Sequence, residues 1–195
     1  MISNGQTIHN PVTGERLTFL ETARQTGGES VRFEAVIAPG GTLASAHQHP
    51  NQTERFEITS GTLTMWVGRR KIETKPGDVL VIEPGTPHNF RNKTGADARM
   101  TVEIRPALSI EPLLETMFGL AADGKTNRWG MPNPFRLAVI ARKNFDTVQL
   151  PLVPVWMQRA ALAVADPVGR ALGFTSTYEP RGTAAGTPSR TPQLA

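Results

Sequence analysis

Two histidines one residue apart, His47 and His49, are the residues of this chain best placed to do chemistry. Residues two apart on a strand face the same side, about 7 Å from each other, so both imidazoles can point toward one position. Glu54 follows five residues after His49, and His88 comes after a later apolar run, while His9 lies outside both segments. Imidazoles with a carboxylate suit a divalent transition metal, so we expect a metal site here.

The composition limits what else this chain can hold. The 195 residues include no cysteine, so a bound metal must rely on nitrogen and oxygen ligands. The formal charge is +4, but the basic residues are scattered, and the cluster Arg69–Lys71 fits a solvated hairpin turn. We therefore expect no nucleic acid as a partner. The polar N-terminal stretch lacks the apolar run of a secretory signal, which favours a cytoplasmic location.

Short strands must position the histidines and the carboxylate. From Arg16 to Arg105, short runs that alternate apolar and polar residues are separated by glycine, proline or asparagine. This pattern predicts an antiparallel sandwich or barrel. The expected strands cover residues 16–22, 30–37, 54–61, 62–68, 71–75, 78–83, 88–92 and 98–105.

The chain changes character after Pro106. Helical spacing of apolar residues predicts helices at 109–121, 135–143 and 155–174, with Pro167 starting a new turn or kinking the last one. We expect a barrel domain at 1–106, a helical extension at 107–178 and a disordered tail at 179–195. The apolar helices should pack on the barrel or on a second copy in a homodimer. The apolar run at 155–165 is too short for stable membrane insertion.

Two spaced motifs resemble those of the cupin superfamily. The first motif, with its His-x-His pair and glutamate between two glycines, fits at Gly41, His47, His49, Glu54 and Gly61. The second fits at Gly77, Gly85, His88 and Asn92. Glu83 stands where that motif has its first proline, a departure that affects a turn and no ligand.

The resemblance implies a mainly β fold, a cupin double-sheet jelly-roll barrel with C-terminal α-helices, and a metal held by His47, His49, Glu54 and His88. Fe²⁺ is the favoured ion, with Mn²⁺, Ni²⁺, Co²⁺ and Zn²⁺ as alternatives, and no organic cofactor is expected. The implied activity is that of a dioxygenase-type oxidoreductase that acts on a small-molecule substrate. As the only carboxylate among the four ligands, Glu54 is also our candidate for the catalytic base. The alternatives are an isomerase or lyase, and a binding protein without turnover.

The two faces of an extended strand separate Glu57 from Glu54 and group two aromatic residues with the ligands. Glu57 lies three positions after Glu54 and should point to the opposite face. Phe56 and Phe90 share their strand faces with Glu54 and His88, which makes them candidates for the substrate pocket. The alternative for both aromatic rings is filling of the barrel core.

Overall fold

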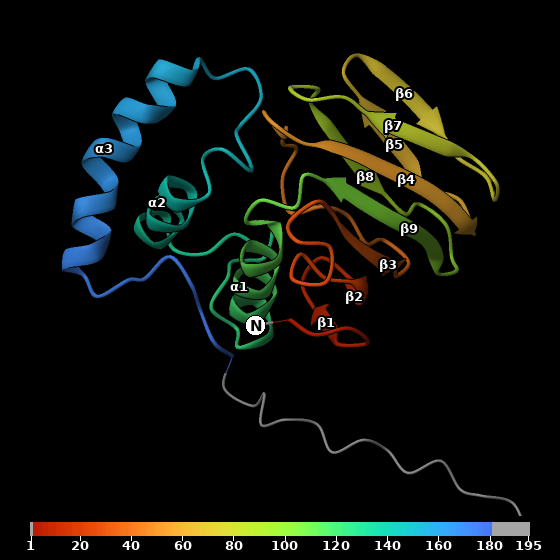
Figure 1. Cartoon of the computed structure of the whole chain (residues 1–195), viewed down its shortest axis with the longest axis horizontal. Helices are drawn as coiled ribbons and strands as arrows, with labels where there is room; N and C mark the ends of the chain where they lie inside the picture. The colour runs from red at the N-terminus through yellow and green to blue at the C-terminus, as the bar shows by residue number, and fades with distance from the viewer. Residues whose placement is uncertain (1, 181–195) are drawn as a thin grey trace, which may run out of the picture.

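The computed structural model describes residues 2–180, and within them two antiparallel sheets face each other (Figure 1). The larger sheet has the strand order β1-β2-β3-β9-β4-β7 and the smaller one the order β6-β5-β8. The strands are β1 (Thr7–Asn10), β2 (Glu15–Glu21), β3 (Val31–Ile37), β4 (Thr53–Ser60), β5 (Thr64–Val67), β6 (Arg70–Glu73), β7 (Val79–Ile82), β8 (His88–Arg91) and β9 (Ala98–Arg105). The predicted mainly β fold with C-terminal helices is confirmed.

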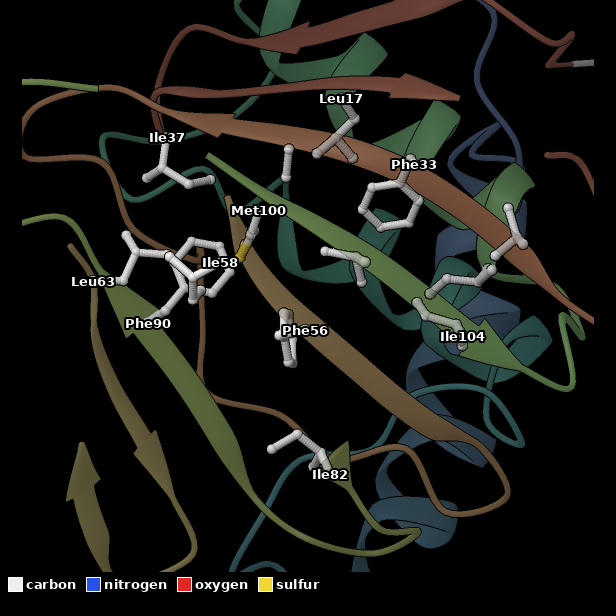
Figure 2. Packing of buried hydrophobic residues seen from close by; sticks show 14 of the residues in the cluster. Leu17, Phe33, Ile37, Phe56, Ile58, Leu63, Ile82, Phe90, Met100 and Ile104 are labelled. Carbon is white, nitrogen blue, oxygen red and sulfur yellow. The ribbon is translucent and has the colours of Figure 1, made fainter. Parts of the chain in front are cut away.

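The core lies between the two sheets and follows the alternation in the sequence. Phe56 and Ile58 of β4 and Met100 of β9 point inward from the larger sheet and meet Phe90 from the smaller one (Figure 2). Each of these side chains is almost fully buried. Burial of a large apolar side chain stabilises the fold by roughly 1.5–3 kcal/mol, so this cluster fixes how the sheets face each other.

Strand β1 was missed by the sequence prediction. Its four residues, TIHN, include the strand formers Thr7 and Ile8, but the run is short and shows no clear apolar-polar alternation, and only Asn10 is buried. The segment is a strand because it pairs antiparallel with β2, Thr7 opposite Thr18 and Asn10 opposite Glu15. This segment is extended because it pairs with a neighbouring strand, and the local sequence carries no information about that pairing.

Gly61 shows why the first motif ends in glycine. Its φ of 72° lies in the left-handed region, and a Cβ added there would lie 2.8 Å from the Cα of Ala98. Only a residue without a side chain fits both conditions. The glycine lets the chain leave β4 closely packed against the start of β9.

Three helices follow the strands: α1 (Ile110–Ala122), α2 (Pro134–Lys143) and α3 (Val155–Ala171). In Figure 1, α1 lies beside β1 and β2, and α3 is the outermost helix. Pro167 lies inside α3, and the helix continues through it to Ala171, so the proline does not begin a separate turn. Gly169 allows α3 to approach α2, because a Cβ there would lie 2.4 Å from the carbonyl oxygen of Phe135.

The outer face of α3 stays in contact with solvent, with Trp156 and Val164 70% and 72% exposed. No helix within residues 2–180 combines the length and the apolar character needed to cross a bilayer. Before the last described residue, the chain returns to α1, where the backbone N–H of Tyr178 donates to the Thr116 hydroxyl. Most of the predicted tail, residues 181–195, lies outside the described residues.

Candidate metal centre

The two histidine motifs are brought together by direct backbone pairing. The N–H of His47 donates to the carbonyl of His88 (3.2 Å), and the N–H of His88 donates back to that of His47 (2.9 Å). Glu54 enters from β4, and His49 lies on the chain between His47 and β4. One nitrogen from each imidazole and one carboxylate oxygen of Glu54 lie within 4.8 Å of one another. The structure thus brings all four predicted ligands to one point.

Backbone carbonyls orient each imidazole. The Nδ1 atoms of His47, His49 and His88 lie 3.2, 2.7 and 3.1 Å from the carbonyl oxygens of Ser45, Thr147 and Thr86, respectively. Since a carbonyl only accepts, each Nδ1 carries the proton, and each Nε2 keeps its lone pair. A hydrogen bond of this type is the usual support of a metal-binding histidine.

Two buried atoms at the centre of the cluster find no hydrogen-bond partner within residues 2–180. The Oε2 atom of Glu54 lies 2.9 Å from Nε2 of His88 and 3.4 Å from Nε2 of His49. Yet neither Oε2 of Glu54 nor Nε2 of His88 makes an aligned hydrogen bond to any described residue. Buried polar atoms normally find a partner. Both atoms are hydrogen-bond acceptors, and they face the same point. A cation bound there would be the missing partner of both, so the cluster can bind a metal.

The charges within the cluster also fit a cation. Burial lowers the pKa of His47 to about 3, and the neighbouring His88 and His49 rings add to the shift. Burial alone would raise the pKa of Glu54, but contacts with His49 and His88 outweigh it and lower that pKa. Burial lowers the pKa of His49, whereas its contact with Glu54 raises it, and the net shift is upward. At neutral pH the site therefore offers an unprotonated His47 and an anionic Glu54, the states that metal binding needs.

The C-terminal segment takes part in the site, which sequence reasoning did not predict. The carbonyl that accepts from His49 belongs to Thr147, in the connection between α2 and α3. Gln48 and Gln149 pair through two backbone hydrogen bonds of 3.1 and 3.0 Å, which hold this connection along the histidine segment. No residue type signals a backbone carbonyl, so the sequence carried no sign of this contact.

A cavity of about 560 Å³ opens onto the cluster between the barrel and the helices. Its wall is largely apolar and combines barrel residues with residues of all three helices, among them Leu17, Phe56, Phe90, Val102, Leu113, Met117, Leu137 and Met157. The two predicted pocket residues, Phe56 and Phe90, line this cavity and also belong to the buried core. Glu57 is directed elsewhere, because its Oε2 accepts from Arg55 (2.9 Å) on the outer face of β4.

Two polar residues of the cavity wall were not singled out from the sequence. Glu15 opens β2, and Asn10 closes β1 directly opposite it. Both are buried, with 6% and 3% of their surface exposed, and both line the cavity. The apolar-polar alternation of β2 places Glu15 on the inward face with Leu17 and Phe19. This alternation is the feature of the sequence that could have identified Glu15 as a cavity residue.

Comparison with known proteins agrees with this picture. Residues 33–104 match the family described as Cupin domain. Quercetin 2,3-dioxygenase from Bacillus subtilis is 31% identical over 80 residues, which is 41% of this chain and 24% of that protein. The uncharacterized protein MJ1618 from Methanocaldococcus jannaschii is 36% identical over 56 residues, 29% of this chain and 45% of that one.

Among solved structures, a predicted oxalate decarboxylase from Thermotoga maritima is similar at a TM-score of 0.48 and 18% identity, over 54% of this chain and 99% of that one. The chain spans less than half the length of either curated relative. The family match covers all four ligand candidates, His47, His49, Glu54 and His88. Residues 33–104 of this chain therefore match a cupin domain.

Proposed function

We propose that this protein is a metal-dependent enzyme of the dioxygenase type that oxidises a largely apolar small organic molecule. The observation that carries the proposal is the apolar cavity of about 560 Å³ that ends at the His47, His49, Glu54 and His88 cluster. A volume of this size suits a small organic ligand. The similarity to a quercetin 2,3-dioxygenase supports the oxidative chemistry.

The four donor atoms restrict which metal ions suit the site. Three imidazole nitrogens and one carboxylate oxygen suit Fe²⁺, Mn²⁺, Ni²⁺, Co²⁺ and Zn²⁺. Fe²⁺ is our favoured ion, since its redox chemistry would activate dioxygen for attack on the substrate. The three Nδ1-to-carbonyl contacts keep the imidazoles in a fixed orientation, so the residues hold the ligand atoms in place before metal and substrate arrive.

Glu54 has a second proposed role beside metal binding. Glu54 is among the residues that line the cavity, so its carboxylate would accept a proton from an acidic hydroxyl of the substrate. The contacts with His49 and His88 that lower its pKa weaken it as a base. A shift of Glu54 away from these rings on substrate binding would restore its basicity, so the proposal requires this carboxylate to move.

The apolar cavity wall would limit the access of water to the reaction. Met117 of α1, Leu137 of α2 and Met157 of α3 cover the barrel interior from the helical side, and no Lys or Arg is among the described residues that line the cavity. An apolar enclosure strengthens electrostatic interactions at the metal and protects reactive species from side reactions. It also favours a substrate with a large apolar part.

The test is oxygen uptake by the full-length protein loaded with each metal in turn, measured with an oxygen electrode. The substrates are aromatic compounds that carry adjacent hydroxyl and carbonyl oxygens. We expect uptake with the Fe²⁺ protein that depends on substrate and is lost in the His47→Ala/His49→Ala variant. Tight, metal-dependent substrate binding without any oxygen uptake would instead identify a binding protein and refute the proposal.

A further inference from the structure

Glu15 is a buried carboxyl that the metal site does not use. It extends inward from β2 on the same face as Leu17 and Phe19 and lines the cavity. Among the described residues it has no cationic partner, and the Thr13 hydroxyl lies beside it. That hydroxyl is itself buried and makes no aligned hydrogen bond within residues 2–180. An isolated carboxyl inside an apolar wall is costly, so its presence calls for a partner.

Asn10 supplies the complementary group. Its Oδ1 accepts from the backbone N–H groups of Val12 (3.1 Å) and Thr13 (3.2 Å), which fixes the amide in the turn between β1 and β2. With Oδ1 engaged, the side-chain NH₂ is the group left to donate, and no described residue accepts from it. Asn10 and Glu15 are directly opposite in the strand register, so their side chains are neighbours on the same face.

These two residues lie far from the metal cluster along the barrel. Glu15 pairs with Ile37, which pairs with Ala98 of β9, whereas Glu54 pairs with Ile104 of the same strand. The six-residue step from Ala98 to Ile104 corresponds to roughly 20 Å along a strand. Figure 2 shows Ile37 and Ile104 at opposite ends of the core. The polar pair and the metal cluster therefore mark two separate points on one cavity wall.

We infer that Glu15 and Asn10 form a second recognition point, one that binds a hydroxyl group of the substrate at a distance from the metal. A hydroxyl satisfies both residues at once, because it donates to the carboxyl of Glu15 and accepts from the NH₂ of Asn10. An ammonium group would leave the Asn10 donors unmatched. A carboxylate would meet Glu15 as a like charge, without a lining Lys or Arg to offset it.

The substrate class follows from this pairing. It is a molecule with a large apolar body and a hydroxyl group remote from the atoms that react at the metal. Burial raises the pKa of Glu15 to about 7, with the Thr13 hydroxyl opposing the shift. The carboxyl can therefore donate as well as accept near neutral pH, which adapts it to a neutral hydroxyl. The inference rests on the proposed function only in treating the cavity as the substrate site.

The test compares two probes of the same shape, 4-phenylphenol and 4-methylbiphenyl, on the full-length protein freed of metal by a chelator. Without metal, the hydroxyl cannot coordinate an ion at the histidine cluster, and the Glu15→Leu variant separates binding at Glu15 from a hydrogen bond to the metal-free imidazoles. We expect 4-phenylphenol to bind at least about tenfold more tightly by fluorescence titration, since a buried hydrogen-bonding site disfavours the analogue that lacks the hydroxyl. Failure of the proposed oxidation would appear only as absent oxygen uptake, so the two results are independent.

Three variants test whether the preference for 4-phenylphenol over 4-methylbiphenyl arises at Glu15 and Asn10. Glu15→Leu should reduce the affinity ratio to about one without weakening 4-methylbiphenyl, which also reports that the cavity has kept its shape. Asn10→Ser, which keeps an oxygen that can accept in the turn, should lower the ratio partially. Glu34→Gln removes a carboxylate from the outer face of the barrel, where it pairs with Arg99, and should leave the ratio unchanged. A ratio near one in the unsubstituted protein, or a ratio that survives Glu15→Leu, would overturn the inference.

Discussion

Replacing Glu15 by glutamine should change how the stability of the protein depends on pH. Burial raises the pKa of this carboxyl from 4.5 to about 7 in the folded state. The unfolded chain exposes the side chain and restores its ordinary pKa. Between these two values the folded protein holds a proton that the unfolded chain has released, so stability falls as the pH rises.

The size of the effect follows from the shift. At 1.36 kcal/mol per pKa unit, a displacement from 4.5 to about 7 corresponds to about 3 kcal/mol. This stability is fully present below pH 4.5 and is lost once the pH has passed about 7. Glutamine has a similar shape and no titrating proton, so Glu15→Gln should lack this loss. Relative to the unsubstituted protein, the variant should become more stable by up to about 3 kcal/mol between pH 4.5 and 8.

The assay is urea unfolding at half-unit steps from pH 4.5 to 8.5, with chelator present so that pH-dependent metal binding does not contribute. Groups common to both proteins cancel in the difference between their unfolding free energies. Glu34→Gln serves as the control for the loss of one carboxylate from the barrel. A difference between Glu15→Gln and the unsubstituted protein that stays constant within about 0.5 kcal/mol over this range would show that Glu15 is not buried as described.

Four further predictions concern the metal site and the helices. Glu54→Gln should keep part of the metal and lower turnover by roughly a hundredfold; elemental analysis and oxygen uptake on the same sample test this, and near-normal turnover at full occupancy would exclude the base role. His47→Ala/His49→Ala should abolish stoichiometric metal binding. Chelation should then lower the melting temperature of the unsubstituted protein only, because a ligand present at a hundredfold its Kd adds about 2.7 kcal/mol to the free energy of unfolding. A chain ending at Pro106 should aggregate on size-exclusion chromatography, because it loses the helices that cover the cavity; a soluble, active, monomeric fragment would contradict this. Gly169→Ala should cost about 1–3 kcal/mol in urea unfolding, since the added Cβ would clash with α2, and unchanged stability would mean that the helices do not pack this closely.

The sequence was enough to identify the fold and the four ligand candidates. The alternation of apolar and polar residues repeats every two positions, which specifies strands and their inward faces. The His-x-His pair, Glu54 and His88 fall at fixed offsets from glycines that turn the chain, such as Gly61. Because these signals are local in the chain, they could be read without knowledge of tertiary contacts. Strand β1 was missed for the converse reason, since its pairing with β2 is what makes it a strand.

Tertiary structure alone decided what surrounds the ligands. The carbonyl of Thr147 that orients His49 lies 98 residues away in the chain and has no side-chain signature. The cavity exists because the helices after Pro106 cover the barrel interior, and which apolar residues line it depends on that packing. Asn10 and Glu15 became a pair through strand register, and the burial that raises the pKa of Glu15 arises only when the wall closes around it. Contacts between distant segments and the exclusion of water are properties of the folded chain, and residue types specify them only through the fold.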